Sequence, residues 1–177
     1  MESLLLLKPL IGREKTLVIT CRKCGESAFP MKQIGPVVTY YCPGGMLHRH
    51  DYVEQKAIRC ILEKEECSQL IVMGHYHCPE MRNVLENYSD TFSPNAQYNL
   101  EALVRHNELP DALAMDRMLT ERNVMDQLKF LKDYYFIKKR LEDHSLTLIG
   151  VLADPEAYTV KEIFRNGIHY NDLITSN

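Results

Sequence analysis

Long hydrophobic runs are absent from this sequence. No stretch approaches the roughly 20 consecutive apolar residues that a membrane-spanning helix requires. The short run Leu4–Leu7 follows Glu2 and precedes Lys8 and Pro9, so it has neither the basic leading segment nor the apolar length of a signal peptide. We therefore expect a cytoplasmic protein without a membrane partner.

An excess of basic charge is absent as well, because 21 Lys and Arg residues stand against 24 Asp and Glu residues. Proteins that bind nucleic acid usually carry a basic patch or stripe. The short basic run at residues 138–140 is better explained as a solvated helix face, so no nucleic-acid partner is expected. Hydrophobic residues make up 45% of the chain, which is typical of a folded domain and argues against disorder.

Segments that would divide the chain are also lacking. We find no internal repeat, low-complexity tract or linker, and 177 residues are enough for one domain with a substantial core. The sequence thus predicts a single domain over residues 1–177. In a reducing compartment its six cysteines are expected to be thiols or metal ligands rather than a disulfide framework.

The hydrophobic pattern predicts alternating strands and helices. The predicted strands are Lys15–Thr20, Pro36–Tyr41, Gln69–Gly74, Leu146–Leu152 and an edge strand at Thr159–Phe164. The predicted helices are Asp51–Cys67 and Asp116–Asp143, with broken helical structure over Pro79–Asp116. Their apolar sides are predicted to be Val53, Ala57, Ile58, Ile61 and Leu62, and Val124, Leu128, Leu131, Tyr135 and Leu141. This alternation predicts an α/β fold, a mostly parallel β-sheet flanked by helices on both faces.

Three of the predicted strands run directly into a residue that can bind a metal. These residues are Cys21, Cys42 and His75. Parallel strands bring their carboxyl ends to one edge of the sheet, where open α/β sheets bind ligands. We therefore expect a functional site at that edge.

Two spaced pairs there have the residue types that zinc prefers, Cys21-x-x-Cys24 and His75-x-x-Cys78. Short spacings let one loop present two ligands to one ion. The sequence predicts Cys21, His75 and Cys78 as zinc ligands and leaves Cys24 open between a fourth ligand and a core residue. Cys42 is predicted to neighbour the site without binding the metal. Core positions are predicted for Cys60 and Cys67, and surface or capping roles for His48, His50, His106, His144 and His169, while His77 is not counted as a ligand.

Several short motifs resemble the β-class carbonic anhydrase family. Ile71–Met81 resembles the family's strand followed by Gly-His-x-x-Cys, and the strand ending at Cys21 resembles the segment with its first zinc cysteine. Weaker matches lie at Gly44-Gly45, at residues 121–124 with Gln127 and Leu131, and at residues 148–150 with Ala153-Asp154. The resemblance implies a β-carbonic anhydrase-like fold over about residues 16–160, Zn²⁺ on Cys21, His75 and Cys78, and a homodimer or larger assembly.

The first family motif, Cys-x-Asp-x-Arg, is altered in this sequence, because Lys23 stands in place of the aspartate and Gly25 in place of the arginine. In the family, the aspartate accepts a hydrogen bond from the zinc-bound hydroxide that attacks carbon dioxide. Lysine has donors and no acceptor, and glycine has no side chain, so neither can replace that pair. The expected function is therefore zinc binding without ordinary CO2 hydration.

Two alternatives remain open from the sequence. The first is an active zinc lyase or hydrolase with an open zinc site, where Lys23 or Arg22 would favour a small anionic substrate such as bicarbonate. The second is a thiol redox protein using Cys21 and Cys24, since neighbouring cations lower a thiol pKa. That second alternative gives no role to His75 and Cys78.

Overall fold

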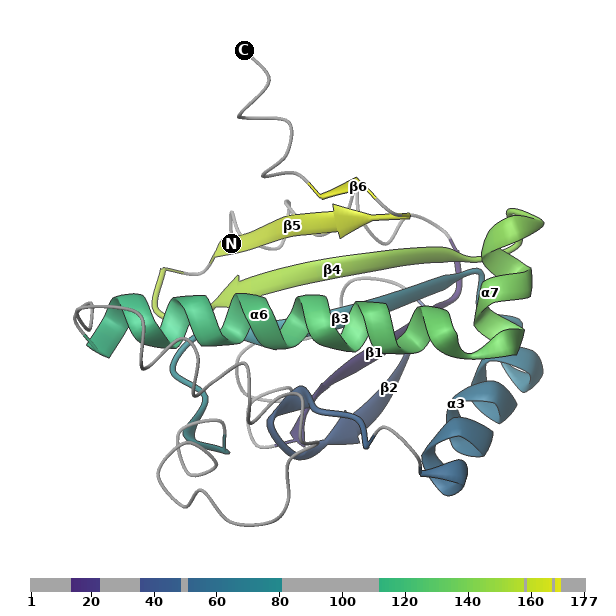
Figure 1. The fold of residues 1–177 in the computed structure, drawn as a ribbon, viewed down its shortest axis with the longest axis horizontal. Coiled ribbons are helices and arrows are strands. Elements are labelled where there is room, and N and C mark those ends of the chain that lie inside the picture. The colour runs from purple at the N-terminus through teal and green to yellow at the C-terminus, as the bar shows by residue number, and fades with distance from the viewer. Residues whose placement is uncertain are drawn as a thin grey trace.

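A computed structural model describes residues 14–22, 36–48, 51–80, 112–157, 159–166 and 168–169. The strands are β1 Thr16–Cys21, β2 Val37–Cys42, β3 Gln69–His75, β4 Thr147–Asp154, β5 Thr159–Arg165 and β6 Ile168–His169. The helices are α3 Tyr52–Lys64, α6 Ala112–Asp133 and α7 Tyr135–Glu142, with a 3₁₀ turn η2 at Pro43–Gly45. These elements form one layered α/β arrangement (Figure 1).

The six strands form one sheet in the order β2-β1-β3-β4-β5-β6. β2, β1, β3 and β4 are parallel, and β5 and β6 are antiparallel to their neighbours. The mostly parallel α/β fold predicted from the sequence is therefore confirmed. The ends of all five predicted strands lie within two residues of the observed ones.

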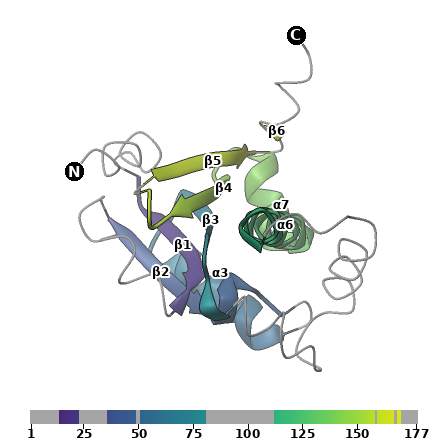
Figure 2. The same ribbon diagram turned by 90° about the vertical axis from the view of Figure 1, so that its left-hand side faces the viewer.

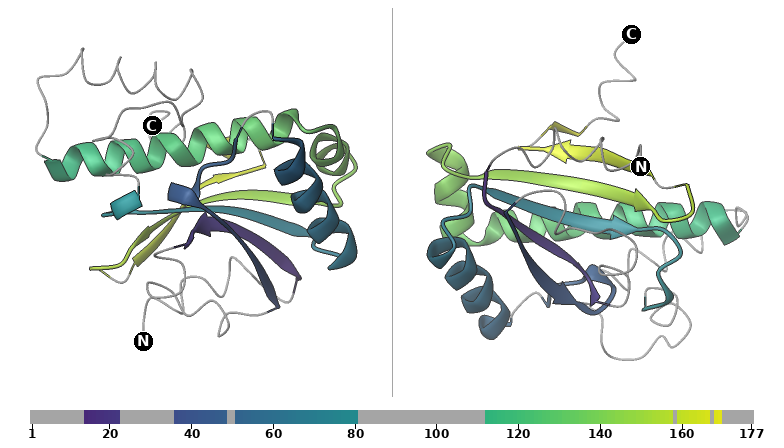
Figure 3. Two further views of the ribbon diagram at one scale, coloured as in Figure 1. Left: turned by 90° about the horizontal axis from the view of Figure 1, so that it is seen from below. Right: turned by 180° about the vertical axis from the view of Figure 1, so that it is seen from behind.

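The three described helices cover the same face of the sheet (Figures 2 and 3). Apolar residues from α3, α6 and α7 join one buried cluster with alternate residues of the strands, such as Leu17, Leu70 and Leu148. The other face carries a second buried cluster, which includes Val18, Ile71 and Ile149 and no residue of the three described helices. The helices that the structure describes thus lie on one face, whereas the sequence predicted helices on both.

Helix α3 begins at an aspartate cap, because the Asp51 carboxylate accepts hydrogen bonds from the N–H groups of Val53 and Glu54. Val53 was predicted to face the core and is 77% exposed, so that prediction is wrong. Glu54 is buried in its place, since its carboxylate accepts a hydrogen bond from the backbone N–H of His48 at 2.6 Å. The polar contact fixes which side of the first turn faces inward.

The second predicted helix, Asp116–Asp143, is two helices. Tyr134 has an extended backbone with φ −71° and ψ 119°, which ends α6 and begins α7. Its ring is buried between Phe130 and Phe136, with centroid distances of 4.9 and 5.6 Å. Tyr135, the first residue of α7, was predicted to face the core and is 78% exposed, so that prediction is wrong.

Candidate metal centre

The parallel strands deliver the predicted residues to one edge of the sheet. Cys21 is the last residue of β1 and lies opposite Cys42 in the register of β1 with β2. His75 is the last residue of β3, and its register partner on β4 is Ala153. A tight turn after His75 then places Cys78 against Cys21.

Cys21, His75 and Cys78 form a compact group of buried metal-binding side chains. Their ligand atoms all lie within 4.8 Å of one another. The two sulfur atoms are 3.7 Å apart. Two thiolates on a tetrahedral zinc, with Zn–S bonds of about 2.3 Å, lie about 3.8 Å apart, so the observed spacing suits that ion.

The His75 ring is oriented by its neighbour on the chain. Its Nδ1 atom lies 3.1 Å from the backbone oxygen of Tyr76 and donates to it. The Nε2 atom is then the acceptor nitrogen, and it is buried without a hydrogen-bond partner among the described residues. An unpaired buried nitrogen costs free energy, and a bound metal ion would satisfy it.

The surroundings of Cys21 and Cys42 favour the neutral thiol over the thiolate. The neighbouring Cys78 side chain and burial raise the pKa of the Cys21 thiol far above its ordinary value. Burial, with the negative charge of Glu54, likewise raises the pKa of Cys42. Metal binding here must therefore release protons, because zinc binds thiolates.

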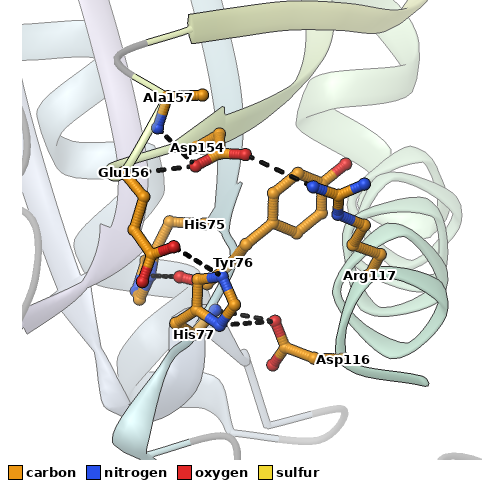
Figure 4. Close-up of polar contacts among 8 residues, drawn as sticks. All are labelled: His75, Tyr76, His77, Asp116, Arg117, Asp154, Glu156 and Ala157. Atoms are coloured by element: carbon orange, nitrogen blue, oxygen red, sulfur yellow. Dashed lines mark hydrogen bonds and ion pairs between the residues drawn. The ribbon is translucent and has the colours of Figure 1, made fainter. Parts of the chain in front are cut away.

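The turn that presents Cys78 depends on a left-handed residue. His77 has φ +60°, a conformation that non-glycine residues seldom adopt. The Asp116 carboxylate, near the start of α6, accepts a hydrogen bond of 2.7 Å from the His77 backbone N–H (Figure 4). This contact holds the turn, and so holds Cys78 next to His75.

A second group of polar contacts ties the end of β4 to the same helix. Asp154 accepts hydrogen bonds from the N–H groups of Glu156 and Ala157. Arg117 lies 3.7 Å from the Asp154 carboxylate, and its guanidinium stands 5.3 Å from the centre of the Tyr76 ring (Figure 4). The sheet edge and α6 are thereby fixed to each other beside the metal-binding group.

The η2 turn closes the other side of the site. Gly44 and Gly45 have φ values of +59° and +71°, which glycine adopts at no steric cost. A Cβ atom on Gly45 would lie 3.7 Å from the backbone nitrogen of Cys21, so the turn packs against the end of β1. Asn123 on α6 donates to the Gly44 oxygen at 3.3 Å, and Gln127 donates to Asn123. The turn predicted from Cys42-Pro43-Gly44-Gly45 is thus part of the site.

Glu80 contributes a carboxylate that sequence reasoning missed. Its Oε2 atom accepts a hydrogen bond from the Gly44 N–H at 2.8 Å and one from the Cys21 thiol at 3.1 Å. The only signal in the sequence is its position two residues after Cys78. Asp116 was missed too, because contacts between distant parts of the chain leave no local pattern.

Some of the remaining predicted residues are described by the structure, and the others lie outside the described residues. Arg22 is exposed just after β1, Cys42 and Cys67 are buried, and Cys60 is half-buried. Cys21, Cys42, Cys60, Cys67 and Cys78 are free thiols. His48 is exposed and pairs with Glu54, and His144 has a left-handed backbone after α7. Outside the described residues lie Lys23, Cys24, Gly25, His50 and His106, and for His169 the backbone alone is described.

Fold and site together define an α/β protein with a Cys₂His group at the carboxyl edge of a parallel sheet. The family model for carbonic anhydrase matches residues 13–160. The chain belongs to the β-class carbonic anhydrase family, as its sequence motifs implied. No curated protein is significantly similar to it in sequence.

Solved structures of β-carbonic anhydrases share the fold at low sequence identity. CafD of Aspergillus fumigatus superposes with a TM-score of 0.69 and 18% identity, covering 86% of this chain and 91% of that one. The β-carbonic anhydrase CcaA gives 0.69 and 22%, covering 90% and 84%. One of two tetrameric enzymes from Sordaria macrospora gives 0.66 and 19%, covering 89% and 85%.

Among the described residues, no helix has both the length and the apolar character needed to cross a bilayer.

Proposed function

We propose that this protein is a zinc-binding member of the β-carbonic anhydrase family that lacks ordinary CO2 hydration. The buried group of Cys21, His75 and Cys78 carries the proposal, because its two sulfur atoms already have the spacing of zinc ligands. The unpaired Nε2 atom of His75 supplies the third donor. Thiolate and imidazole donors favour zinc over the oxygen-preferring cations magnesium and calcium.

The proposed loss of hydration activity rests on the altered first motif. Lys23 and Gly25 follow Cys21 where the family has an aspartate and an arginine. A lysine cannot accept the hydrogen bond that the aspartate accepts, and a glycine cannot hold an acid in place. Zinc supplies Lewis acidity in an open site and folding free energy in a closed one, and we propose the second role.

An open zinc site acting on a small anion such as bicarbonate is a second candidate. The observation in its favour is that the metal-binding group in the described residues provides three ligands, which is the number that catalytic zinc sites have. Thiol redox chemistry is less well supported, because reactive cysteines have a lowered pKa and that of Cys21 is raised.

Metal analysis tests the zinc proposal. We expect purified protein to carry about one zinc ion per chain, as a single Cys₂His group implies. Changing Cys21, His75 and Cys78 together to alanine should abolish zinc binding, whereas Cys60→Ser should leave it unchanged because Cys60 lies on α3, outside the group. Wild-type protein without stoichiometric metal, or a triple variant that keeps it, would contradict the proposal.

A stopped-flow hydration assay on the zinc-loaded protein separates the two candidates. We expect no CO2 hydration above the rate of free zinc in the same buffer. A faster rate that disappears in His75→Ala would establish the open, catalytic site instead. The zinc content of each sample must be measured first, so that an inactive zinc-loaded protein is not confused with a protein that has no bound zinc.

Assembly and location are two further parts of the proposal. We propose a homodimer or larger assembly, since the similar Sordaria macrospora structures are of tetrameric enzymes. Sedimentation velocity on the zinc-loaded protein would check it. The free thiols of the described cysteines support a reducing compartment such as the cytoplasm.

A further inference from the structure

The carboxylate of Glu80 lies directly against the metal-binding group. Its Oε2 atom is 3.1 Å from the Cys21 sulfur, and the Gly44 backbone N–H holds the same oxygen at 2.8 Å. The backbone oxygen of Gly44 in turn accepts a hydrogen bond from Asn123 of α6. The turn after His75, η2 and α6 therefore position the Glu80 oxygen together. Glu80 is half-buried, and its carboxylate contacts the predicted ligand Cys21.

The distance to Cys21 is close to that between two ligands of the same ion. A thiolate sulfur and a carboxylate oxygen on one tetrahedral zinc are about 3.6 Å apart, from bonds of about 2.3 and 2.1 Å. The group whose ligand atoms are mutually within 4.8 Å comprises Cys21, His75 and Cys78. Glu80 is not part of that group, so sharing the ion requires a side-chain rotation that brings a carboxylate oxygen closer to His75 and Cys78.

We propose that Glu80 is the fourth protein ligand of the zinc ion and closes its coordination shell. This inference rests on the proposed function, in which Cys21, His75 and Cys78 bind zinc. A Cys₂HisGlu shell leaves no coordination position for a substrate. The bound zinc would then stabilise the fold and would not hydrate CO2. The inference assigns to Glu80 the position that Cys24 or solvent would otherwise occupy.

Cobalt substitution tests the inference without relying on activity. Co²⁺ is loaded into the wild-type protein and into Glu80→Ala, Cys24→Ser and Glu63→Gln, the last being an exposed acid on α3 that serves as a charge control. Zinc affinity is measured on the same proteins by competition with a chromophoric chelator. Sodium azide is then titrated as a small anion that binds an open metal position.

We expect Glu80→Ala to lose zinc affinity by at least about tenfold, since even outer partners of metal ligands contribute that much. The wild-type cobalt spectrum should not respond to azide at concentrations that shift the spectrum of Glu80→Ala, because only the variant has an open position. Cys24→Ser and Glu63→Gln should match the wild type in affinity and in the intensity of the thiolate-to-cobalt band.

Three results would overturn the inference. The first is an unchanged affinity and azide response in Glu80→Ala. The second is a weaker thiolate band in Cys24→Ser, which would assign the fourth position to Cys24. The third is an azide response of the wild type equal to that of Glu80→Ala, which would leave the position to solvent. Failure of the proposed function is distinguishable, because the wild-type protein would then bind neither zinc nor cobalt.

Discussion

At the scale of single residues, the metal-binding group depends on side chains that are not ligands. His77 is left-handed at φ +60°, and such a conformation costs about 1–3 kcal/mol unless the surroundings hold it. Asp116 supplies part of that support by accepting the His77 N–H at 2.7 Å. The positions of His75 and Cys78 therefore depend on an acid some forty residues further along the chain.

Removing the Asp116 carboxylate should weaken metal binding without removing a ligand. We expect Asp116→Ala to lower zinc affinity by about tenfold, because the turn that carries Cys78 loses its hydrogen bond to α6. Competition with a chelator measures the affinity. Asp126→Ala is the matched control, since Asp126 is an acid of the same helix that pairs with Arg122 and Lys129.

Equal zinc affinity in Asp116→Ala and Asp126→Ala would show that the turn keeps its shape without the carboxylate. A thermal denaturation of both metal-free variants should accompany the measurement. It separates a local effect on the turn from a general loss of stability, which would affect both affinity and folding.

The candidate ligands could be predicted from the sequence, whereas the residues that support them could not. Two short spacings, Cys21-x-x-Cys24 and His75-x-x-Cys78, indicated the metal site, and strand ends indicated where it would lie. Glu80 and Asp116 act through contacts that span 36 to 59 residues of chain. No local spacing records such contacts, so a single sequence cannot reveal them.

At the scale of elements, the close approach of α6 to the sheet positions the ligand strand. Gly74 immediately precedes His75, and a Cβ atom there would lie 2.6 Å from Val124 Cγ2 and 2.9 Å from Thr120 Cγ2. Gly150 on β4 pairs with Val72 of β3, and a Cβ atom there would lie 2.6 Å from Leu128 Cδ1. At both positions the absence of a Cβ atom lets α6 pack closely against the sheet.

Filling the space at Gly74 should push the helix away from β3. We expect Gly74→Ala to destabilise the fold by about 1–3 kcal/mol, as overpacking of a close-packed core does. Urea denaturation measures the change in the free energy of unfolding. The double variant Gly74→Ala with Val124→Ala should recover part of the loss, because the shortened side chain makes room for the new methyl group.

A Gly74→Ala protein as stable as the wild type would mean that α6 can shift at no cost. If the losses in stability of the two single variants simply add in the double variant, the Val124 side chain does not clash with the new methyl group. Either result would contradict the packing described here for β3 and α6.

Strands and helices were easier to predict than the break between α6 and α7 and the contacts of the residues around it. The strands were found because β-branched and apolar runs end at turn residues, as at Cys42-Pro43-Gly44-Gly45. The break at Tyr134 was missed, since no proline or glycine marks it and the cause is the packing of its ring with Phe130 and Phe136. The predicted burial of Tyr135 was wrong as well.

At the scale of the whole molecule, a metal ion would join segments that lie far apart along the chain. Cys21 ends β1, while His75 ends β3 and Cys78 follows it, more than fifty residues later. A ligand that binds the folded state alone stabilises it by an amount set by its concentration and affinity. The same ion should therefore control both the site and the stability of the fold.

Zinc should raise the thermal stability of the protein, and a chelator should reverse the effect. Free zinc at a hundred times its dissociation constant contributes about 2.7 kcal/mol. For a chain of this size, that corresponds to a rise in Tm of about 5–10 °C. Calorimetry of the wild type with zinc, and again after chelation, measures it. The triple alanine variant of Cys21, His75 and Cys78 should show no rise, and an equal rise in both proteins would place the stabilising zinc elsewhere on the surface.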